Sequence, residues 1–150
     1  MKLRIPPPFV AAMIALLMWL ASRAAPAAAF VLPAGRLIPA CVALAGVAIA
    51  LAGVVAFRRV RTTVNPLQPE KASTLVTSGI YHLTRNPMYL GMLLVLLAWA
   101  LMLSNAVAVI IVPTFILYMN RFQIGPEETA LASAFGAAYV QYNSRVRRWL

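Results

Sequence analysis

The sequence predicts an all-α fold, a multi-pass integral membrane helical bundle with about four transmembrane helices and a cytoplasmic, amphipathic C-terminal helix. Three observations carry this prediction. Hydrophobic residues form 63% of the chain, charged residues only 11%, and the mean hydropathy is +0.84, whereas a soluble domain carries about 25% charged residues. The apolar residues gather in long uncharged stretches, whose lengths suit membrane helices. Arginines cluster between these stretches, as expected at the ends of membrane helices.

The first apolar stretch, Phe9–Ala21, follows three consecutive prolines. Proline is favoured in the first turn of a helix, and extension into the alanine-rich segment that follows supplies the roughly 20 residues that a membrane helix needs. A cleaved signal peptide over residues 1–29 is the alternative, because a positive start, a short apolar core and an alanine-rich segment are typical of secretory signals. We favour a retained helix whose outer end lies near Arg23.

The second apolar stretch, Leu37–Phe57, is the cleanest membrane-spanning helix in the sequence. It contains no charged residue over a length that crosses a bilayer. Gly46 and Gly53 lie within it and favour the close approach of a neighbouring helix, since small residues dominate contacts between membrane helices. Arginines follow directly, so we expect residues 1–61 to form two N-terminal spans.

The next segment, residues 62–86, is polar and contains two prolines and Gly79. Such a composition is typical of a loop. We expect a cytoplasmic loop at the membrane surface with a short helical turn. The whole chain, residues 1–150, is short enough to form a single domain.

Residues 87–122 are predicted to form a helical hairpin, because this apolar segment is too long for one span and fits two. The third helix is expected over Pro87–Leu103 and the fourth over Ala106–Phe122, with a tight turn at Ser104-Asn105. Pro113 lies inside the fourth helix and predicts a kink there.

Residues 123–150 are predicted to form a last helix. Gly125, Pro126 and two glutamates are typical of a helix start. One face then carries Glu128, Leu131, Phe135, Tyr139 and Tyr142, at the spacing of three and four residues that places side chains together on a helix. We interpret this aromatic face as packing against the bundle or the membrane. Arginines near the end of the chain match the negative end of a helix dipole.

The distribution of charge predicts the orientation in the membrane. Four spans place both termini in the cytoplasm, and most basic residues then lie on that side. Only Arg23 and Arg36 fall on the other side. The basic residues on the cytoplasmic side would face anionic membrane lipids and are Lys2, Arg4, Arg58, Arg59, Arg61, Lys71, Arg85, Arg121, Arg145, Arg147 and Arg148.

Composition also argues against two kinds of partner. The net charge of +10 would suggest nucleic acid in a soluble protein, but membrane topology explains it here, and no basic stretch is rich in aromatics for stacking on bases. The chain has one cysteine, Cys41, and one histidine, His82. We therefore expect no metal site built on these side chains.

Two polar clusters are candidates for a site. The first lies in the segment Gly79–Gly91, and the second is Glu127-Glu128, the only acidic pair in a basic chain. The predicted hairpin brings these clusters to the same membrane surface. Helix capping by Asn86-Pro87, a topological role for Arg85 and acids in a first helical turn are the purely structural alternatives.

The combined pattern resembles the isoprenylcysteine carboxyl methyltransferase family and the related phospholipid N-methyltransferases. The resemblance covers about the C-terminal half, Thr74 to Trp149. Its residues are Gly79, Tyr81, Arg85, Asn86, Pro87, Tyr89 and Gly91, followed by Glu127, Glu128, Leu131, Phe135, Gly136, Tyr139 and Tyr142.

This resemblance implies a bacterial-type integral membrane methyltransferase that uses S-adenosylmethionine. In such enzymes a pocket on the cytoplasmic side, formed by C-terminal helices and loops, holds the cofactor, and an opening toward the lipid admits the substrate's apolar tail. It implies catalytic roles for Arg85 and Glu128. The cofactor-binding residues that it implies are Tyr81, Arg85, Asn86, Pro87, Tyr89, Gly91, Glu127 and Glu128.

The acceptor that this reading favours is a lipophilic carboxylate. The family pattern has histidine where this chain has Asn86, and asparagine cannot titrate as a base. An ionised carboxylate needs no base, whereas an amine or phospholipid acceptor would need a proton removed. The composition is typical of bacteria, so we expect the protein in the inner (cytoplasmic) membrane.

Two non-enzymatic classes stay open at this point. A small four-helix transporter is one, although the four predicted spans contain no Asp, Glu, His or Lys, which proton-coupled transporters usually place inside the membrane. A non-catalytic membrane subunit is the other, and in it the polar clusters would serve capping and topology alone.

Overall fold

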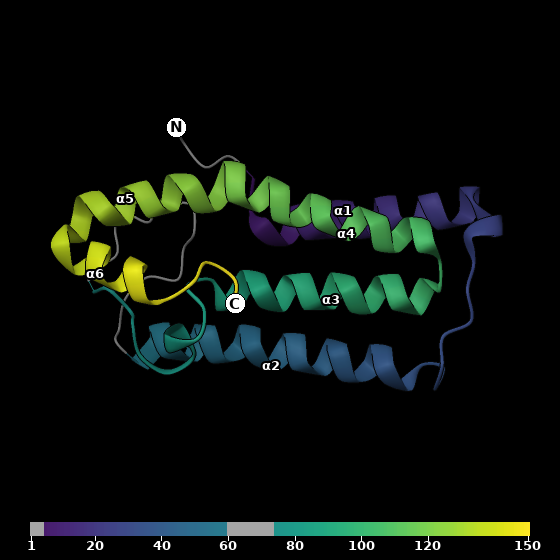
Figure 1. Cartoon of the computed structure of the whole chain (residues 1–150), viewed down its shortest axis with the longest axis horizontal. Helices are drawn as coiled ribbons and strands as arrows, with labels where there is room; N and C mark the ends of the chain where they lie inside the picture. The colour runs from purple at the N-terminus through teal and green to yellow at the C-terminus, as the bar shows by residue number, and fades with distance from the viewer. Residues whose placement is uncertain (1–4, 60–73) are drawn as a thin grey trace.

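The protein folds as α-helices, which pack side by side along one direction (Figure 1). A computed structural model describes residues 5–59 and 74–150. Within these residues the backbone forms helices and no strand, only one isolated bridge between Ala29 and Asn105, which confirms the all-α prediction. The α-helices are α1 (Pro7–Ala24), α2 (Leu37–Arg59), α3 (Pro87–Leu103), α4 (Ala106–Tyr118), α5 (Gly125–Phe135) and α6 (Ala137–Arg145).

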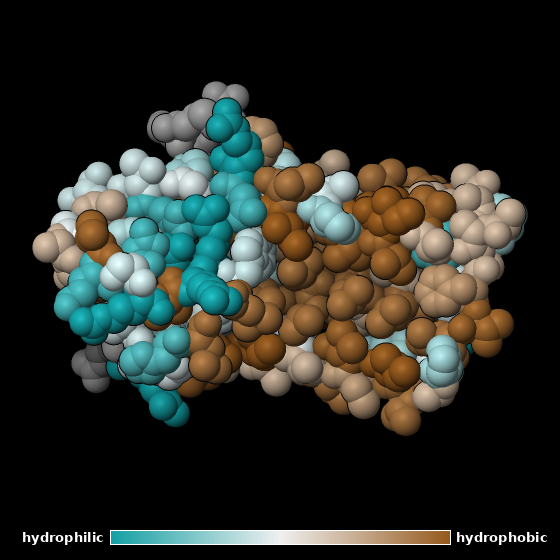
Figure 2. Space-filling model, in the orientation of Figure 1, coloured by the Kyte–Doolittle hydropathy of each residue, from teal (hydrophilic) through white to brown (hydrophobic). Residues whose placement is uncertain are grey.

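Three helical stretches are long and apolar enough to cross a membrane: Pro7–Ala24, Leu37–Arg59 and Ala106–Phe135. Helix α3 is apolar but shorter, with 17 residues, or about 25 Å at 1.5 Å per residue. The surface over the helices is hydrophobic along most of the molecule and becomes polar at one end (Figure 2). The chain is therefore a multi-pass membrane protein.

Helix α3 is the central helix of this bundle. It contacts α1, α2 and α4 and has buried residues along its length, from Pro87 to Ala100. Its packing against α2 depends on glycine, as expected for Gly46 and Gly53. A Cβ atom at Gly46 would lie 2.7 Å from the carbonyl oxygen of Gly91, and one at Gly53 would lie 3.0 Å from Met88 Cγ. The two backbones thus approach more closely than larger residues would allow.

The predicted starts and turns of the first four helices agree with the structure. Helix α1 begins in the run of prolines, and α3 spans Pro87–Leu103 as predicted. Ser104 adopts a left-handed conformation with a φ of 48°, and the Asn105 side chain caps α4 by accepting a hydrogen bond from the Val107 N–H.

The predicted break between the fourth helix and the last helix is wrong. Helix α4 continues through a π-helical segment, Met119–Ile124, into α5, so one helix runs over Ala106–Phe135. The N–H of Gly125 donates to the carbonyl of Asn120, five residues back. Proline normally interrupts an α-helix because it lacks an N–H and its ring clashes with the preceding turn. The π turn directly before Pro126 widens the helix there, and Pro126 is accommodated in its interior.

The predicted single helix over residues 123–150 is also wrong, because the chain turns at Gly136. The φ of Gly136 is 52° and its ψ is −127°, a conformation that favours glycine. Helix α6 then ends at Arg145. Residues 146–150, which we call the C-terminal tail, return toward the start of α3, and the arginines in it therefore do not form the last turn of a helix.

The ends of the bundle differ in charge, in the direction that the sequence predicts. Helix α1 starts, α2 ends and α3 starts at the end of the molecule that also carries α5 and α6 (Figure 1). Arg23 and Arg36 lie at the opposite end, next to the end of α1 and the start of α2. Four of the basic residues predicted on the cytoplasmic side, at positions 2, 4, 61 and 71, lie outside the described residues. The part of the predicted loop over residues 62–73 also lies outside them.

Candidate functional site

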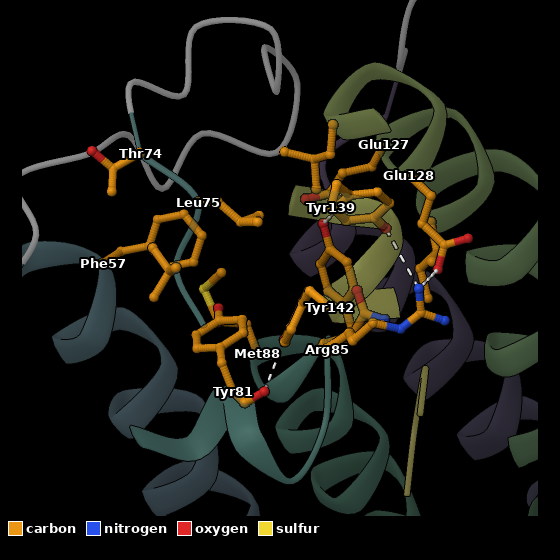
Figure 3. Close-up of a pocket in the computed structure, with 15 residues that line it drawn as sticks. Phe57, Thr74, Leu75, Tyr81, Arg85, Met88, Glu127, Glu128, Tyr139 and Tyr142 are labelled. Atoms are coloured by element: carbon orange, nitrogen blue, oxygen red, sulfur yellow. Dashed lines mark hydrogen bonds and ion pairs between the residues drawn. The ribbon is translucent and has the colours of Figure 1, made fainter. Parts of the chain in front are cut away.

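A pocket lies at the polar end of the bundle, between the start of α3 and the helices α5 and α6 (Figure 3). It encloses about 640 Å³ including its open mouth. The segment before α3 and the end of α2 complete its wall. Its lining residues are Phe57, Thr74, Leu75, Val76, Tyr81, Arg85, Asn86, Met88, Tyr89, Ile124, Glu127, Glu128, Leu131, Tyr139 and Tyr142.

Glu128 is the centre of an ion-pair network on one wall of this pocket. Arg148 donates to both of its oxygens, from Nε to Oε1 at 3.0 Å and from Nη2 to Oε2 at 2.6 Å. Arg85 Nη1 lies 3.1 Å from Glu128 Oε1. The hydrogen bonds to Glu128 raise the pKa of Arg148. Two cations thus hold the Glu128 carboxylate in place.

Arg85 has hydrogen-bonding capacity left over at the wall of the pocket. Its side chain is 11% exposed, and its Nη1 also donates to the Tyr139 hydroxyl at 3.5 Å. Its Nε is buried without a hydrogen-bond partner. A buried donor without a partner costs about 1–3 kcal/mol, and a ligand that offers an acceptor there would remove this cost.

Glu127 makes a separate set of contacts, away from the arginines. The Tyr89 hydroxyl donates to Glu127 Oε2 at 3.0 Å, and Gln123 Nε2 donates to that hydroxyl at 3.4 Å. Gln123 belongs to the π-helical segment, so this segment helps to position Tyr89 and, through it, Glu127. The two neighbouring glutamates therefore have different roles: Glu128 is bound by two arginines, while Glu127 keeps acceptor capacity for a ligand.

Aromatic side chains form the remaining wall. Phe57 and Tyr81 meet edge to face with ring centroids 5.4 Å apart, and Tyr139 and Tyr142 meet at 6.4 Å. The Tyr142 hydroxyl donates to the Tyr81 carbonyl at 2.8 Å. Burial raises the pKa of the Tyr81 and Tyr142 phenols, so both are neutral at physiological pH. Leu131, Tyr139 and Tyr142, which the sequence assigned to packing, thus line the pocket.

The C-terminal tail closes the pocket at the start of α3. The N–H of Arg85 donates to the Arg147 carbonyl at 3.0 Å. Asn86 Nδ2 donates to the Arg148 carbonyl at 2.9 Å, and Thr84 Oγ1 donates to the same oxygen at 3.3 Å. Asn86 makes no side-chain capping hydrogen bond to α3. The interpretation of Asn86 as a side-chain helix cap is therefore wrong, because its amide binds the tail instead.

The structure brings most of the predicted site residues together and leaves two outside. Pro87 is buried at the start of α3, where it faces Gly53, and Gly91 contacts Gly46 of α2. Neither lines the pocket, and both belong to helix packing. The predicted residues that line it are Tyr81, Arg85, Asn86, Tyr89, Glu127 and Glu128.

Sequence reasoning missed several contributors to the site, among them Arg148, Phe57 and Gln123. Arg148 was assigned to a helix end, Phe57 to a membrane span, and Gln123 to the start of the last helix. The signals were weak, because each contact joins residues far apart in sequence. One signal was detectable for Arg148. Glu70, Glu127 and Glu128 are the only acidic side chains in the sequence, so an arginine that forms an ion pair with a side chain must bind one of these three.

The arrangement suits a ligand that carries both charges and a flat ring. Glu127 offers an acceptor to an amine or hydroxyl, the Arg85 guanidinium offers donors to a carboxylate, and the aromatic wall offers faces for stacking. Within residues 5–59 and 74–150, no group of three or more His, Cys, Asp or Glu residues is placed to hold a metal ion.

A family profile decides the relationship of the chain to known proteins. The profile described as "Phospholipid methyltransferase" matches residues 36–138, which include α2, α3, the long helix and most of the pocket. The chain belongs to the phospholipid methyltransferase family. This result confirms the resemblance seen in the sequence. The matching profile describes phospholipid methyltransferases, and the relatives described next are isoprenylcysteine O-methyltransferases.

Relatives with named activities align with about half of the chain. A protein-S-isoprenylcysteine O-methyltransferase of Schizosaccharomyces pombe is 34% identical over 76 residues, 51% of this chain and 32% of that protein. Protein-S-isoprenylcysteine O-methyltransferase B of Arabidopsis thaliana is 32% identical over 80 residues, 53% of this chain and 41% of that protein. The alignments thus cover less than half the length of these relatives.

A shorter relative is more similar in sequence. An uncharacterized protein of Haemophilus influenzae is 56% identical over 63 residues, which are 42% of this chain and the whole of that protein. No solved structure matches the chain.

Proposed function

We propose that this protein is an integral-membrane methyltransferase that uses S-adenosylmethionine to methylate a lipophilic acceptor, with a carboxylate as the acceptor group. The observation that carries the proposal is the pocket at the polar end of the bundle, where Glu127, Arg85 and an aromatic wall meet. Membership of a methyltransferase family gives this pocket its chemical context.

The residues of the pocket fit the chemical groups of S-adenosylmethionine. This cofactor has an α-carboxylate, an α-amine, ribose hydroxyls and an adenine ring. The unpartnered Nε of Arg85 would donate to the carboxylate. Glu127, with Tyr89 as its hydrogen-bond partner, would accept from the amine or a hydroxyl, and tyrosines of the aromatic wall would stack on the adenine.

Methylation of a carboxylate requires little proton chemistry from the protein. When bound, the cofactor supplies an electrophilic methyl group on a sulfonium sulfur. The acceptor oxygen would take this methyl group from the sulfur, which would leave as a neutral thioether, while Arg85 and Glu127 would hold the cofactor. No proton is lost, so the pocket residues act by positioning the two reactants and by excluding water.

A groove in the membrane part of the bundle supports a lipophilic acceptor. It lies between α1, α2 and α3, encloses about 930 Å³ including its open side, and is lined almost entirely by apolar residues such as Ala11, Leu51 and Trp99. Met88 lines the polar pocket, and Met92, one turn further along α3, lines the groove. An acceptor with its reactive group in the pocket would therefore place an apolar tail along α3.

N-methylation of an amine is the second candidate. The description of the matching family names phospholipids, some of which carry amine head groups. An amine must lose a proton during methyl transfer, and Glu127 is the carboxylate in the pocket that arginine does not occupy.

We place the reaction in the bacterial inner membrane, with both termini in the cytoplasm, because the described arginines concentrate at the pocket end.

Titration of the purified protein in nanodiscs with S-adenosylmethionine tests the cofactor assignment. We expect saturable binding by the wild type and a loss of affinity of at least tenfold in Arg85→Ala and Glu127→Gln, since hydrogen bonds to charged groups contribute about 1.5–3 kcal/mol each. Arg121→Ala is the matched control, because Arg121 is exposed on the same long helix as Glu127.

Three results of this titration have distinct meanings. Saturable binding that both pocket substitutions weaken, with Arg121→Ala unchanged, supports the proposal. Folded wild-type protein that binds no S-adenosylmethionine would contradict the enzyme. Binding that neither pocket substitution weakens would reject this pocket as the cofactor site.

A further inference from the structure

We propose that the C-terminal tail, residues 146–150, is a working part of the cofactor pocket and that Arg148 is a positioning residue. Its role is to hold both oxygens of Glu128, so that Arg85 keeps its Nε free for the carboxylate of the ligand. This inference rests on the proposed function, and it concerns residues that lie beyond the span matched by the family profile, which ends at residue 138.

The tail is fixed against the pocket at several points. Its backbone accepts hydrogen bonds from the Arg85 N–H, from Asn86 Nδ2 and from Thr84 Oγ1. Trp149 Nε1 donates to Asn120 Oδ1 at 3.1 Å, which ties the tail to the π-helical segment. The tail therefore bridges the start of α3 and the long helix, the two elements that supply the charged residues of the pocket.

The geometry of the ion pairs gives Arg148 a specific task. Arg148 binds Glu128 through two parallel hydrogen bonds, the arrangement in which arginine and carboxylate interact most strongly. Arg85 reaches Glu128 through Nη1 alone, and its Nε has no partner. Figure 3 shows Arg85 directed at Glu128 and Tyr139 from below the pocket.

Removal of Arg148 would change the hydrogen bonds that Arg85 makes. Glu128 would then have a free oxygen, and Arg85 could form a two-bond pair with it through Nε and a terminal nitrogen. This rearrangement would satisfy the buried Nε inside the protein and withdraw it from the ligand. The loss of affinity would therefore be specific for the carboxylate of the ligand, and it would require Glu128.

The alternative is that Arg148 only stabilises the fold. Exposed ion pairs contribute little to stability, and the Arg148 side chain is 36% exposed. A merely structural role would lower the melting temperature and weaken every ligand of the pocket to the same extent. The two roles are therefore distinguished by the ratio of affinities for ligands with and without a carboxylate.

The experiment compares S-adenosylmethionine with decarboxylated S-adenosylmethionine as ligands of the full-length protein in nanodiscs. Arg148→Gln is expected to weaken binding of the first on the order of tenfold and to leave binding of the second within about twofold. Arg148→Lys should fall between, because lysine cannot form the two-bond pair. Arg145→Gln, at an exposed position at the end of α6 and outside the tail, should change neither affinity.

A double substitution tests whether Arg148 acts through Glu128. The Glu128→Gln/Arg148→Gln variant should bind S-adenosylmethionine no more weakly than Glu128→Gln alone, because the competing carboxylate is gone. An unchanged affinity ratio in Arg148→Gln, or additive losses in the double variant, would overturn the positioning role. Wild-type protein that binds neither ligand would instead contradict the proposed function itself, so the two failures are distinguishable.

Discussion

Two regions of this bundle are held together by different kinds of interaction. Between α2 and α3 the contact is made of small residues and close backbones, with Gly46 against Gly91. At the polar end, hydrogen bonds and ion pairs join the start of α3 to α5, α6 and the tail. The first region tolerates no added volume, and the second tolerates no lost charge. Each region therefore predicts a different response to substitution.

The largest effect is expected from Gly46→Leu. A Cβ atom at this position would lie 2.7 Å from the Gly91 carbonyl oxygen and 2.9 Å from Leu94 Cβ, so α2 and α3 must separate. Overpacking of this kind costs about 1–3 kcal/mol and more where backbone must move. The thermal unfolding midpoint in detergent should fall strongly. Leu44→Ala, on the exposed face of α2, is the control, and an equal effect of both would refute the close contact.

Glu128→Gln should affect the polar end next most strongly. It removes the charge that holds Arg85 and Arg148. The cost should stay well below the roughly 3–5 kcal/mol of a fully buried pair, because the Arg148 side chain is partly exposed. Hydrogen exchange of residues 146–150 should accelerate while α2 stays protected. Unchanged exchange in the tail would show that the ion pairs do not hold it.

Tyr89→Phe should have a smaller effect, confined to Glu127. The substitution removes one donor to Glu127 and one acceptor for Gln123, and a hydrogen bond to a charged group such as the Glu127 carboxylate contributes about 1.5–3 kcal/mol. S-adenosylmethionine affinity is expected to change severalfold. Tyr118→Phe, on the long helix that carries Glu127 but outside the pocket lining, should leave this affinity unaltered; a matching change there would remove the special role of Tyr89.

Asn86→Asp should have the smallest effect and separates two interpretations of one residue. Aspartate caps a helix as well as asparagine does, so a capping role predicts unchanged stability. The structure instead uses the amide as a donor to the Arg148 carbonyl, and a carboxylate cannot donate. We expect a loss of about 1 kcal/mol in unfolding free energy, measured by thermal or chemical unfolding. Equal stability of Asn86→Asp and wild type would favour the cap.

The sequence predicted the membrane-spanning part of the molecule better than the polar end. Length and charge alone gave the bounds of α3, because an apolar stretch between Asn86 and Ser104 has few alternatives. The convergence of Arg85 with Glu127 and Glu128 followed from a hairpin. The continuous helix did not follow, because Gly125-Pro126 with two acids imitates a helix start and a π turn has no local signature.

The tail was beyond sequence reasoning for a related physical reason. Its contacts join Arg147 and Arg148 to residues more than sixty positions earlier, and local patterns carry no information on such pairs. A terminal run of arginines matches the helix dipole equally well. Only the three-dimensional fold distinguishes an arginine that ends a helix from one that binds Glu128.

Hydrogen–deuterium exchange of the full-length protein in nanodiscs, with and without saturating S-adenosylmethionine, tests the central claim most directly. The pocket assignment predicts new protection in three segments: residues 74–91, 119–131 and 137–150. The end of the bundle near Arg23 and Arg36 should be unaffected. Protection at that opposite end, or no protection anywhere at saturation, would contradict the account.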